Sequence, residues 1–150
     1  MAQINSNLYA SFQQVFLRFA DKVALTTTSG VEHTYSSLDN ESARLARYLS
    51  EQGIQPGDRV SVQVEKSPEA LWLYLACLRG GFVFHPLNTG YKENELEYYF
   101  SDAEPSVIIC DVSADQLMRK LAEKTNIAKL FTLNADGSGS LIEDSRATAD

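Results

Sequence analysis

The chain has 150 residues, of which 44% are hydrophobic and 22% are charged, a composition typical of one globular domain with a sizeable core. Its formal net charge of -7 and an acidic run at Glu93, Glu95 and Glu97 oppose phosphate backbones and anionic lipids, so we expect no nucleic acid and no membrane among its partners. No apolar run approaches the ~20 residues of a membrane span, and the start of the chain lacks the order of a signal peptide, so we expect a cytoplasmic protein.

The first third of the chain predicts two helices with a hairpin between them. Apolar residues from 8 to 19 have the one-face spacing of an amphipathic helix, which Asn7 can cap. Two β-rich runs, 23–27 and 32–35, flank Gly30 and predict a hairpin. The second helix takes its cap from Ser36 or Ser37 and ends at Gly53, and its buried face consists of Leu38, Ser42, Leu45, Ala46 and Leu49.

The middle of the chain predicts a strand and a buried helix. Residues 59–65 alternate valines with polar residues, as a strand with one buried face does. Ser67, Pro68 and Glu69 then combine a hydroxyl cap, a first-turn proline and an acid near the positive helix end. The helix over 70–78 is apolar on every side, so it must lie inside the protein or under another domain.

The stretch 78–88 is where this helix stops and a buried strand begins. The pair Gly80 and Gly81 ends the helix, because glycine enters the left-handed region without a Cβ clash. Pro86 closes the strand. Ligands of open α/β sheets bind beyond the carboxyl ends of strands, so His85 and Asn88 are candidate residues near a substrate. The alternative is a helix-to-strand connection without chemistry.

The last third predicts two more helices and two more strands. A helix over 92–102 is followed by a short apolar strand over 107–110. Ser113 begins a capping box for the next helix, Asn126 ends that helix in the left-handed conformation, and a strand over 129–133 follows.

From Asn134 the composition shifts to small polar residues, which predicts a flexible segment in which only Leu141 and Ile142 dock briefly. Before it, strands alternate with helices of about ten residues, as right-handed βαβ crossovers do. The expected fold class is therefore α/β, an open and mainly parallel sheet with flanking helices plus an N-terminal β-hairpin.

A search for chemistry finds little. Neither His33 nor His85 has a second His, Cys or carboxylate spaced to complete a metal set, and the two cysteines fall in apolar segments as free buried thiols do. The run 137–140 follows a strand but lacks the lysine of a phosphate loop. Alternate glutamates on a helix diverge. We therefore assign no catalytic, cofactor-binding or metal-binding residue.

The ordered set of motifs resembles the amino-terminal part of the adenylate-forming superfamily, which includes acyl-CoA synthetases, adenylation domains of peptide synthetases and luciferases. The resemblance covers about residues 7 to 133. It is carried by His33-Thr34-Tyr35, Gly57-Asp58-Arg59-Val60, Ser67-Pro68-Glu69 and the stretch 78–88. Within the superfamily, Glu65-Lys66-Ser67 and the run 86–91 look most like malonyl-CoA synthetases.

The resemblance implies an enzyme that joins a small carboxylate, such as malonate, to ATP with Mg and then transfers the acyl group to CoA. The family's phosphate loop and catalytic residues come later in its chains, and none occurs in residues 1–150. On this basis residues 1–133 are an N-terminal α/β subdomain, and residues 134–150 are a flexible linker leading to the phosphate loop. The fragment alone is expected to be inactive and to need no cofactor.

The resemblance also bears on partners. The expected partner is the remainder of the parent enzyme, and exposure of the apolar helix over 70–78 predicts self-association. A departure from close relatives is Lys92, where they tend to have a threonine. Two alternatives stay open: a stand-alone binding or regulatory domain of flavodoxin-like shape, and part of an adenylation domain that serves a carrier protein.

Overall fold

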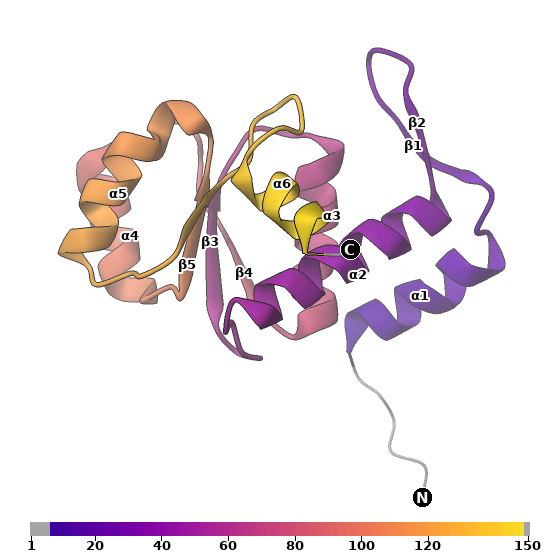
Figure 1. The fold of residues 1–150 in the computed structure, drawn as a ribbon, viewed down its shortest axis with the longest axis horizontal. Coiled ribbons are helices and arrows are strands. Elements are labelled where there is room, and N and C mark those ends of the chain that lie inside the picture. Colours follow the sequence, from indigo (N-terminus) through magenta and orange to yellow (C-terminus); the bar gives the residue numbers. More distant parts are fainter. Residues whose placement is uncertain (1–6, 149–150) are drawn as a thin grey trace, which may run out of the picture.

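The chain forms a four-stranded parallel sheet with helices on both faces and a separate two-stranded hairpin (Figure 1). This computed structural model describes residues 7–148. The sheet has the order β4-β3-β5-β6. Its strands are β3 (Arg59–Gln63), β4 (Val83–Pro86), β5 (Val107–Cys110) and β6 (Leu130–Thr132). The expected α/β fold class with a parallel sheet and an antiparallel hairpin is thus confirmed.

The central strands are the buried ones. All four residues of β5 are buried, as a run of Val-Ile-Ile-Cys between two neighbouring strands requires. The prediction of a buried strand after the glycine pair is wrong for β4, which lies at the edge with Val83 47% exposed. The buried residue is instead Phe82, immediately before the strand. Pro86, which has no N–H to donate to a further strand, is accommodated because β4 lies at the edge.

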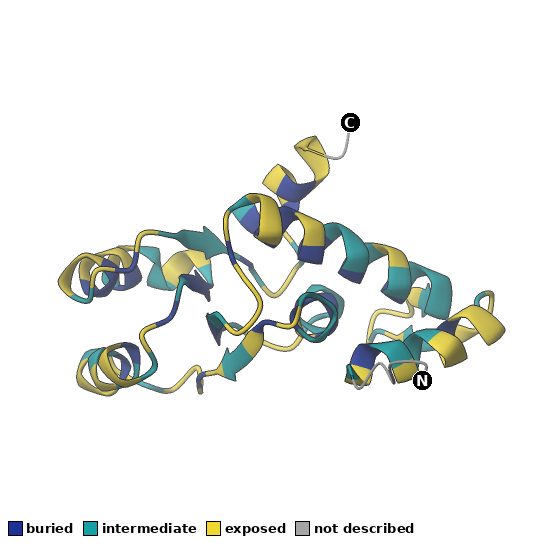
Figure 2. Cartoon of the chain, turned by 90° about the horizontal axis from the view of Figure 1, so that it is seen from below, coloured by how far each residue is buried: buried dark blue, intermediate teal, exposed yellow. Residues whose placement is uncertain are grey.

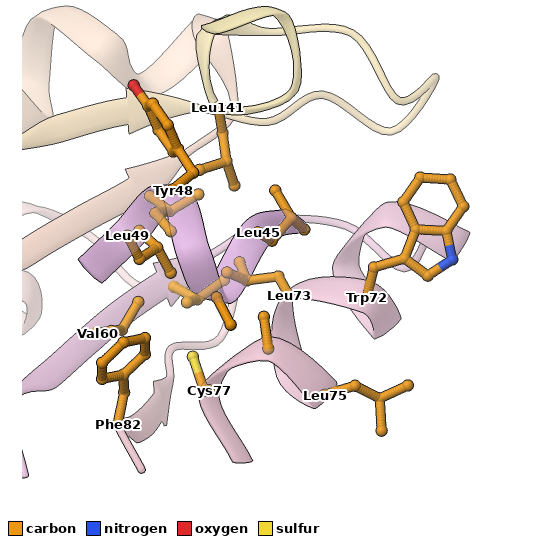
Figure 3. Packing of buried hydrophobic residues seen from close by; sticks show 14 of the residues in the cluster. Leu45, Tyr48, Leu49, Val60, Trp72, Leu73, Leu75, Cys77, Phe82 and Leu141 are labelled. Atoms are coloured by element: carbon orange, nitrogen blue, oxygen red, sulfur yellow. The ribbon is translucent and has the colours of Figure 1, made fainter. Parts of the chain in front are cut away.

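Three helices cover one face of the sheet. They are α2 (Tyr35–Glu51), α3 (Pro68–Gly80) and α6 (Ser140–Ala147). Figure 3 shows Leu45 and Leu49 of α2 beside Leu73 of α3, with Val60 and Phe82 below them. The predicted inward face of α2 is confirmed, since Leu38, Ser42, Leu45, Ala46 and Leu49 are all buried.

Two helices cover the other face. The apolar residues of α4 (Glu93–Ala103) and α5 (Asp115–Lys124) pack on Ile108 and Cys110, and in Figure 2 their outer sides are exposed. Ion pairs join the two helices at their surface, with Lys120 Nζ and Lys124 Nζ each 2.6 Å from a carboxylate oxygen of α4. Within residues 7–148, no helix combines the length and apolar character needed to cross a membrane.

Helix α1 (Leu8–Arg18) and the hairpin of β1 (Val23–Thr26) and β2 (Glu32–Thr34) lie at the opposite end of the molecule from α4 and α5 (Figure 1). A polar clamp made of Tyr9, Asp39 and Arg79 fixes α1 to α2 and α3. The hydroxyl of Tyr9 donates to Asp39 at 2.6 Å, and Arg79 donates to both, at 2.7 and 2.8 Å.

Several helix boundaries differ from prediction because an upstream side chain takes the cap. Thr34, rather than Ser36 or Ser37, accepts the N–H of Ser37 at the start of α2. Asp111, rather than Ser113, begins the next helical segment: it caps the short 3-10 turn η1 (Val112–Ala114), and α5 starts after that turn. The predicted glycine stop of α3 is confirmed, with Gly81 left-handed at φ 72°.

The flexible segment predicted from Asn134 needs correction, because its second half is the docked helix α6. Leu141 and Ile142 are buried against the sheet, and the hydroxyl of Ser140 accepts the N–H of Thr132 at 3.0 Å. Arg44 of α2 donates to the buried Ser145. The small polar composition of this segment predicted flexibility because it gave little weight to the two adjacent apolar residues Leu141 and Ile142. A short helix can be stabilised by packing such residues against its neighbours, even though its own length is insufficient.

Candidate functional site

The two candidate residues lie at the carboxyl end of β4: His85 belongs to the strand, and Asn88 lies in the loop just after it. The imidazole Nδ1 of His85 is 2.8 Å from the hydroxyl of Ser61 on β3, and the His85 ring lies 6.2 Å from that of Tyr99. Burial lowers the pKa of His85, and the opposing charges of Asp102 and Arg59 are smaller influences. The contacts with Ser61 and Tyr99 fix the orientation of the imidazole.

Asn88 is occupied in building a turn. Its side-chain oxygen accepts the N–H of Gly90 at 2.8 Å, and its carbonyl accepts the side-chain amide of Gln63 at 2.8 Å. The same amide lies 3.4 Å from the carbonyl of Tyr91. Gln63 thus ties the loop after β4 to the end of β3.

The arrangement is one of positioning rather than of catalysis. The pair Ser61 and His85 resembles a nucleophile and its base, but the serine is fully buried and no substrate atom can reach it. The rings of Tyr91 and Tyr99 stack with their centroids 5.1 Å apart, beside the ring of His85. Among residues 7–148, no group of three or more His, Cys, Asp or Glu side chains could hold a metal ion.

Sequence reasoning missed Ser61 and Gln63, which hold the two candidate residues. Both are polar positions of the alternating strand β3, and alternation alone suggests a solvated face. In the structure they are 0% and 7% exposed. A useful signal was available: two uncharged side chains with hydrogen-bonding groups, two residues apart, in a strand that turned out to be central.

A hollow of about 790 Å³ lies elsewhere, between the hairpin and the start of α3. Hairpin residues 25–29 line it together with His33, Lys66 and Asp136. The first turn of α3 offers little to a ligand there, because Ser67 already accepts the N–H of Ala70 at 3.0 Å. The charged residues that line the hollow are one lysine and two carboxylates, from Glu69 and Asp136, so its lining does not favour an anionic ligand.

The buried thiols are inert. Burial raises the pKa of both Cys77 and Cys110 to about 12, so neither is a nucleophile near neutral pH.

Comparison with known proteins finds a match over almost the whole chain. The family model described as "AMP-binding enzyme" matches residues 12–148. The 3-oxocholest-4-en-26-oate–CoA ligase of Rhodococcus rhodochrous is 30% identical over 118 residues, which cover 79% of this chain and 21% of that protein. The medium-chain fatty-acid–CoA ligase of Escherichia coli K12 is 33% identical over 100 residues, which cover 67% of this chain and 18% of that protein.

Among solved structures, MatB from Rhodopseudomonas palustris is similar in both apo and ATP-bound forms. The identity is 41% and the TM-score 0.86, with 95% of this chain and 28% of MatB covered. The chain thus spans about a fifth of the length of the curated relatives cited and little more than a quarter of MatB.

Proposed function

Because this chain belongs to the AMP-binding enzyme family, we propose that it is the amino-terminal part of an acid–thiol ligase that makes an acyl-CoA through an acyl-adenylate. The observation that carries the proposal is the match of residues 12–148 to the family model, supported by similarity to two named CoA ligases. In the proposed reaction a carboxylate joins ATP with release of pyrophosphate. The CoA thiol then takes the acyl group and releases AMP.

Malonate is the substrate we propose. The supporting observations are the run 86–91, which resembles that of malonyl-CoA synthetases, and the 41% identity to MatB. His85 and Asn88 keep a supporting role in this proposal, because their hydrogen bonds shape the loop that carries the run.

Two observations on residues 7–148 support placing Mg-ATP elsewhere. No group of three or more His, Cys, Asp or Glu side chains there could hold a metal ion, and Ser67 accepts an N–H of the first turn of α3. No step of the reaction is therefore assigned to a residue of this chain. ATP, Mg and CoA would bind to the polypeptide outside these 150 residues, and the isolated chain would be inactive.

A coupled pyrophosphate assay tests the proposal on two proteins: the 150-residue chain and the complete polypeptide that its gene encodes. With ATP, malonate and CoA, we expect pyrophosphate release from the complete polypeptide and none from the chain alone. Activity with another small carboxylate but not with malonate would remove only the substrate assignment. Release by the chain alone would refute its inactivity. Replacing CoA by a phosphopantetheinylated carrier protein tests the alternative that the chain is part of an adenylation domain that serves a carrier protein.

The alternative function is a stand-alone binding or regulatory domain. The observation behind it is the strand order, because β4-β3-β5-β6 is the second-first-third-fourth order with which flavodoxin-like sheets begin. A native reading frame that stops after Asp150 would support this alternative. A frame that continues into a Ser/Thr/Gly-rich loop ending in lysine would exclude it.

We further propose a cytoplasmic location and self-association of the isolated chain. α3 buries most of its apolar surface, but Tyr74 stays 37% exposed, and on α1 Leu8 and Leu17 are 51% and 66% exposed. Light scattering at high concentration tests the self-association, and a strict monomer would contradict it. Residues 1–133 remain our subdomain boundary, with α6 as a docked extension.

A further inference from the structure

The buried hydroxyl of Ser61 constrains where the imidazole of His85 carries its hydrogen. Ser61 is 0% exposed, and among residues 7–148 its one side-chain hydrogen bond is the contact with Nδ1 of His85 at 2.8 Å. A serine hydroxyl has a single hydrogen to donate, and here it can be donated to Nδ1. If Nδ1 carried the ring hydrogen, the buried O–H would lack an acceptor, which is unfavourable. The neutral imidazole therefore carries its hydrogen on Nε2.

Protonation of His85 is incompatible with this hydrogen bond. In the imidazolium form both ring nitrogens donate, so Nδ1 can no longer accept from Ser61. The serine hydroxyl would then be a buried donor without a partner, and the cost of such a donor falls on the protonated state alone. Burial of His85 acts in the same direction, because it lowers the pKa of the imidazole.

The charged and titratable groups that face His85 come from two elements. On β3, Arg59 lies two residues before Ser61 and therefore on the same face of the sheet, and its charge lowers the pKa of His85. On α4, Tyr99 contacts the imidazole edge-on, and the charge of Asp102 raises the pKa of His85. A positive charge on the imidazole is thus repelled by β3 and attracted to α4.

The imidazole is connected to the loop after β4 through the aromatic rings of α4 and the loop. The ring of Tyr99, which contacts His85, stacks on the ring of Tyr91 with centroids 5.1 Å apart. Tyr91 follows the turn in which the side chain of Asn88 accepts the N–H of Gly90 at 2.8 Å. A movement of the imidazole toward α4 would therefore displace the stacked rings and the turn beside them.

We propose that His85 is a pH-sensitive switch at the junction of β3, β4 and α4. In the neutral form, Ser61 fixes the imidazole as the Nε2–H tautomer. In the protonated form, the imidazole exchanges Ser61 for Asp102, and the turn at 88–90 loosens. The switch operates below about pH 6.5, the ordinary pKa of histidine. It concerns the chain itself, so it holds whether or not the proposed enzymatic function does.

Nitrogen NMR with isotope-labelled histidine tests the tautomer, in the 150-residue chain and in the complete polypeptide. The chain has two histidines, and comparison with His85→Gln assigns their signals. Well above about pH 6.5, we expect the His85 signals to be those of the Nε2–H tautomer. Ser61→Ala removes the hydroxyl and should give a mixture of both tautomers. A His85 in the Nδ1–H tautomer in the unmutated chain would overturn the proposal, whatever the variant does.

A pH titration of the same samples tests the switch. Asp102→Asn should lower the titration midpoint of His85, because it removes the charge that favours the imidazolium. Ser61→Ala should raise the midpoint, because it removes the donor that protonation leaves unpaired.

The backbone amide signals of two glycines report on the turn. The Gly90 signal should shift with the midpoint of His85 and should stop shifting in His85→Gln. Gly53, whose N–H donates to a carbonyl at the end of α2 at 2.9 Å, is the control and should stay constant. A Gly90 signal that does not follow the protonation of His85, or equal midpoints in the unmutated chain and both variants, would refute the switch.

Discussion

Replacing Lys92 by threonine should stabilise the chain, because α4 begins with half of a capping box. Lys92 has the extended conformation of an N-cap residue, φ -101° and ψ 177°, and its N–H donates to the carboxylate of Glu95 at 2.8 Å. The reciprocal bond needs a side-chain acceptor at residue 92, which an ammonium group does not provide. The first turn of α4 therefore lacks one acceptor.

The size of the gain follows from two contributions. A threonine hydroxyl that accepts the N–H of Glu95 is worth about 1 kcal/mol. Removing a positive charge from the positive end of the helix dipole adds about 0.3 kcal/mol at this exposed position. For a chain of this size, the sum corresponds to a rise of about 3 to 5 °C in thermal midpoint.

Differential scanning calorimetry of three proteins separates these contributions. Lys92→Ala removes the charge without supplying an acceptor, so it should recover only the smaller part of the gain. Lys92→Thr should exceed it by about 1 kcal/mol. If threonine lowers the midpoint or leaves it unchanged, or if alanine does as well as threonine, then the hydroxyl does not cap the helix and the reasoning fails.

Three further predictions use the same calorimetric or denaturant assays. Burial alone would raise the pKa of Asp39, but hydrogen bonds from Tyr9 and Arg79 outweigh it and hold the pKa below its usual 3.8. The clamp's contribution to the free energy of unfolding is thus complete above that pH and is lost as the pH falls through the folded pKa. Asp39→Asn should reduce this loss of stability at acid pH, and an unchanged loss would contradict the assignment. Gly139→Ala should cost about 3 kcal/mol through strain and a backbone clash, whereas Gly30→Ala, with nothing within 4 Å of the new Cβ, should cost only about 1 kcal/mol; equal costs would refute the close approach. Both thiols, with pKa values of about 12, should react with a thiol reagent at neutral pH only after denaturant is added, and rapid reaction in the native chain would contradict their burial.

The sequence predicts those parts of the fold that depend on local periodicity. The inward face of α2, the stop of α3 at Gly81 and the left-handed end of α5 at Asn126 all follow from spacing or from one residue's conformational freedom. Caps were less predictable, because several hydroxyl and carboxylate side chains stand close together before α2 and α5. Thr34 and Asp111 take the caps because each has the extended conformation of an N-cap residue.

The rest depends on which elements become neighbours in space. Nothing in the sequence of β4 says that it lies at the edge, because strand order is set by the crossovers and not by the strand. The burial of Ser61 and Gln63 has the same origin, since α4 and α5 cover their face of the sheet. His85 lies near the carboxyl end of β4 and Asn88 lies just after the strand, and only the fold shows that their polar groups bond to neighbouring residues.

The clamp between α1 and the body of the molecule has a consequence for synthesis on the ribosome. Tyr9 and Arg79 are 70 residues apart in the chain, and Asp39 lies 40 residues before Arg79. Translation proceeds from the amino terminus, so α1 is complete long before the guanidinium that fixes it has been made. The first helix therefore spends most of the early synthesis with its apolar stripe uncovered, and chaperone contacts during translation should concentrate on it until α3 leaves the exit tunnel.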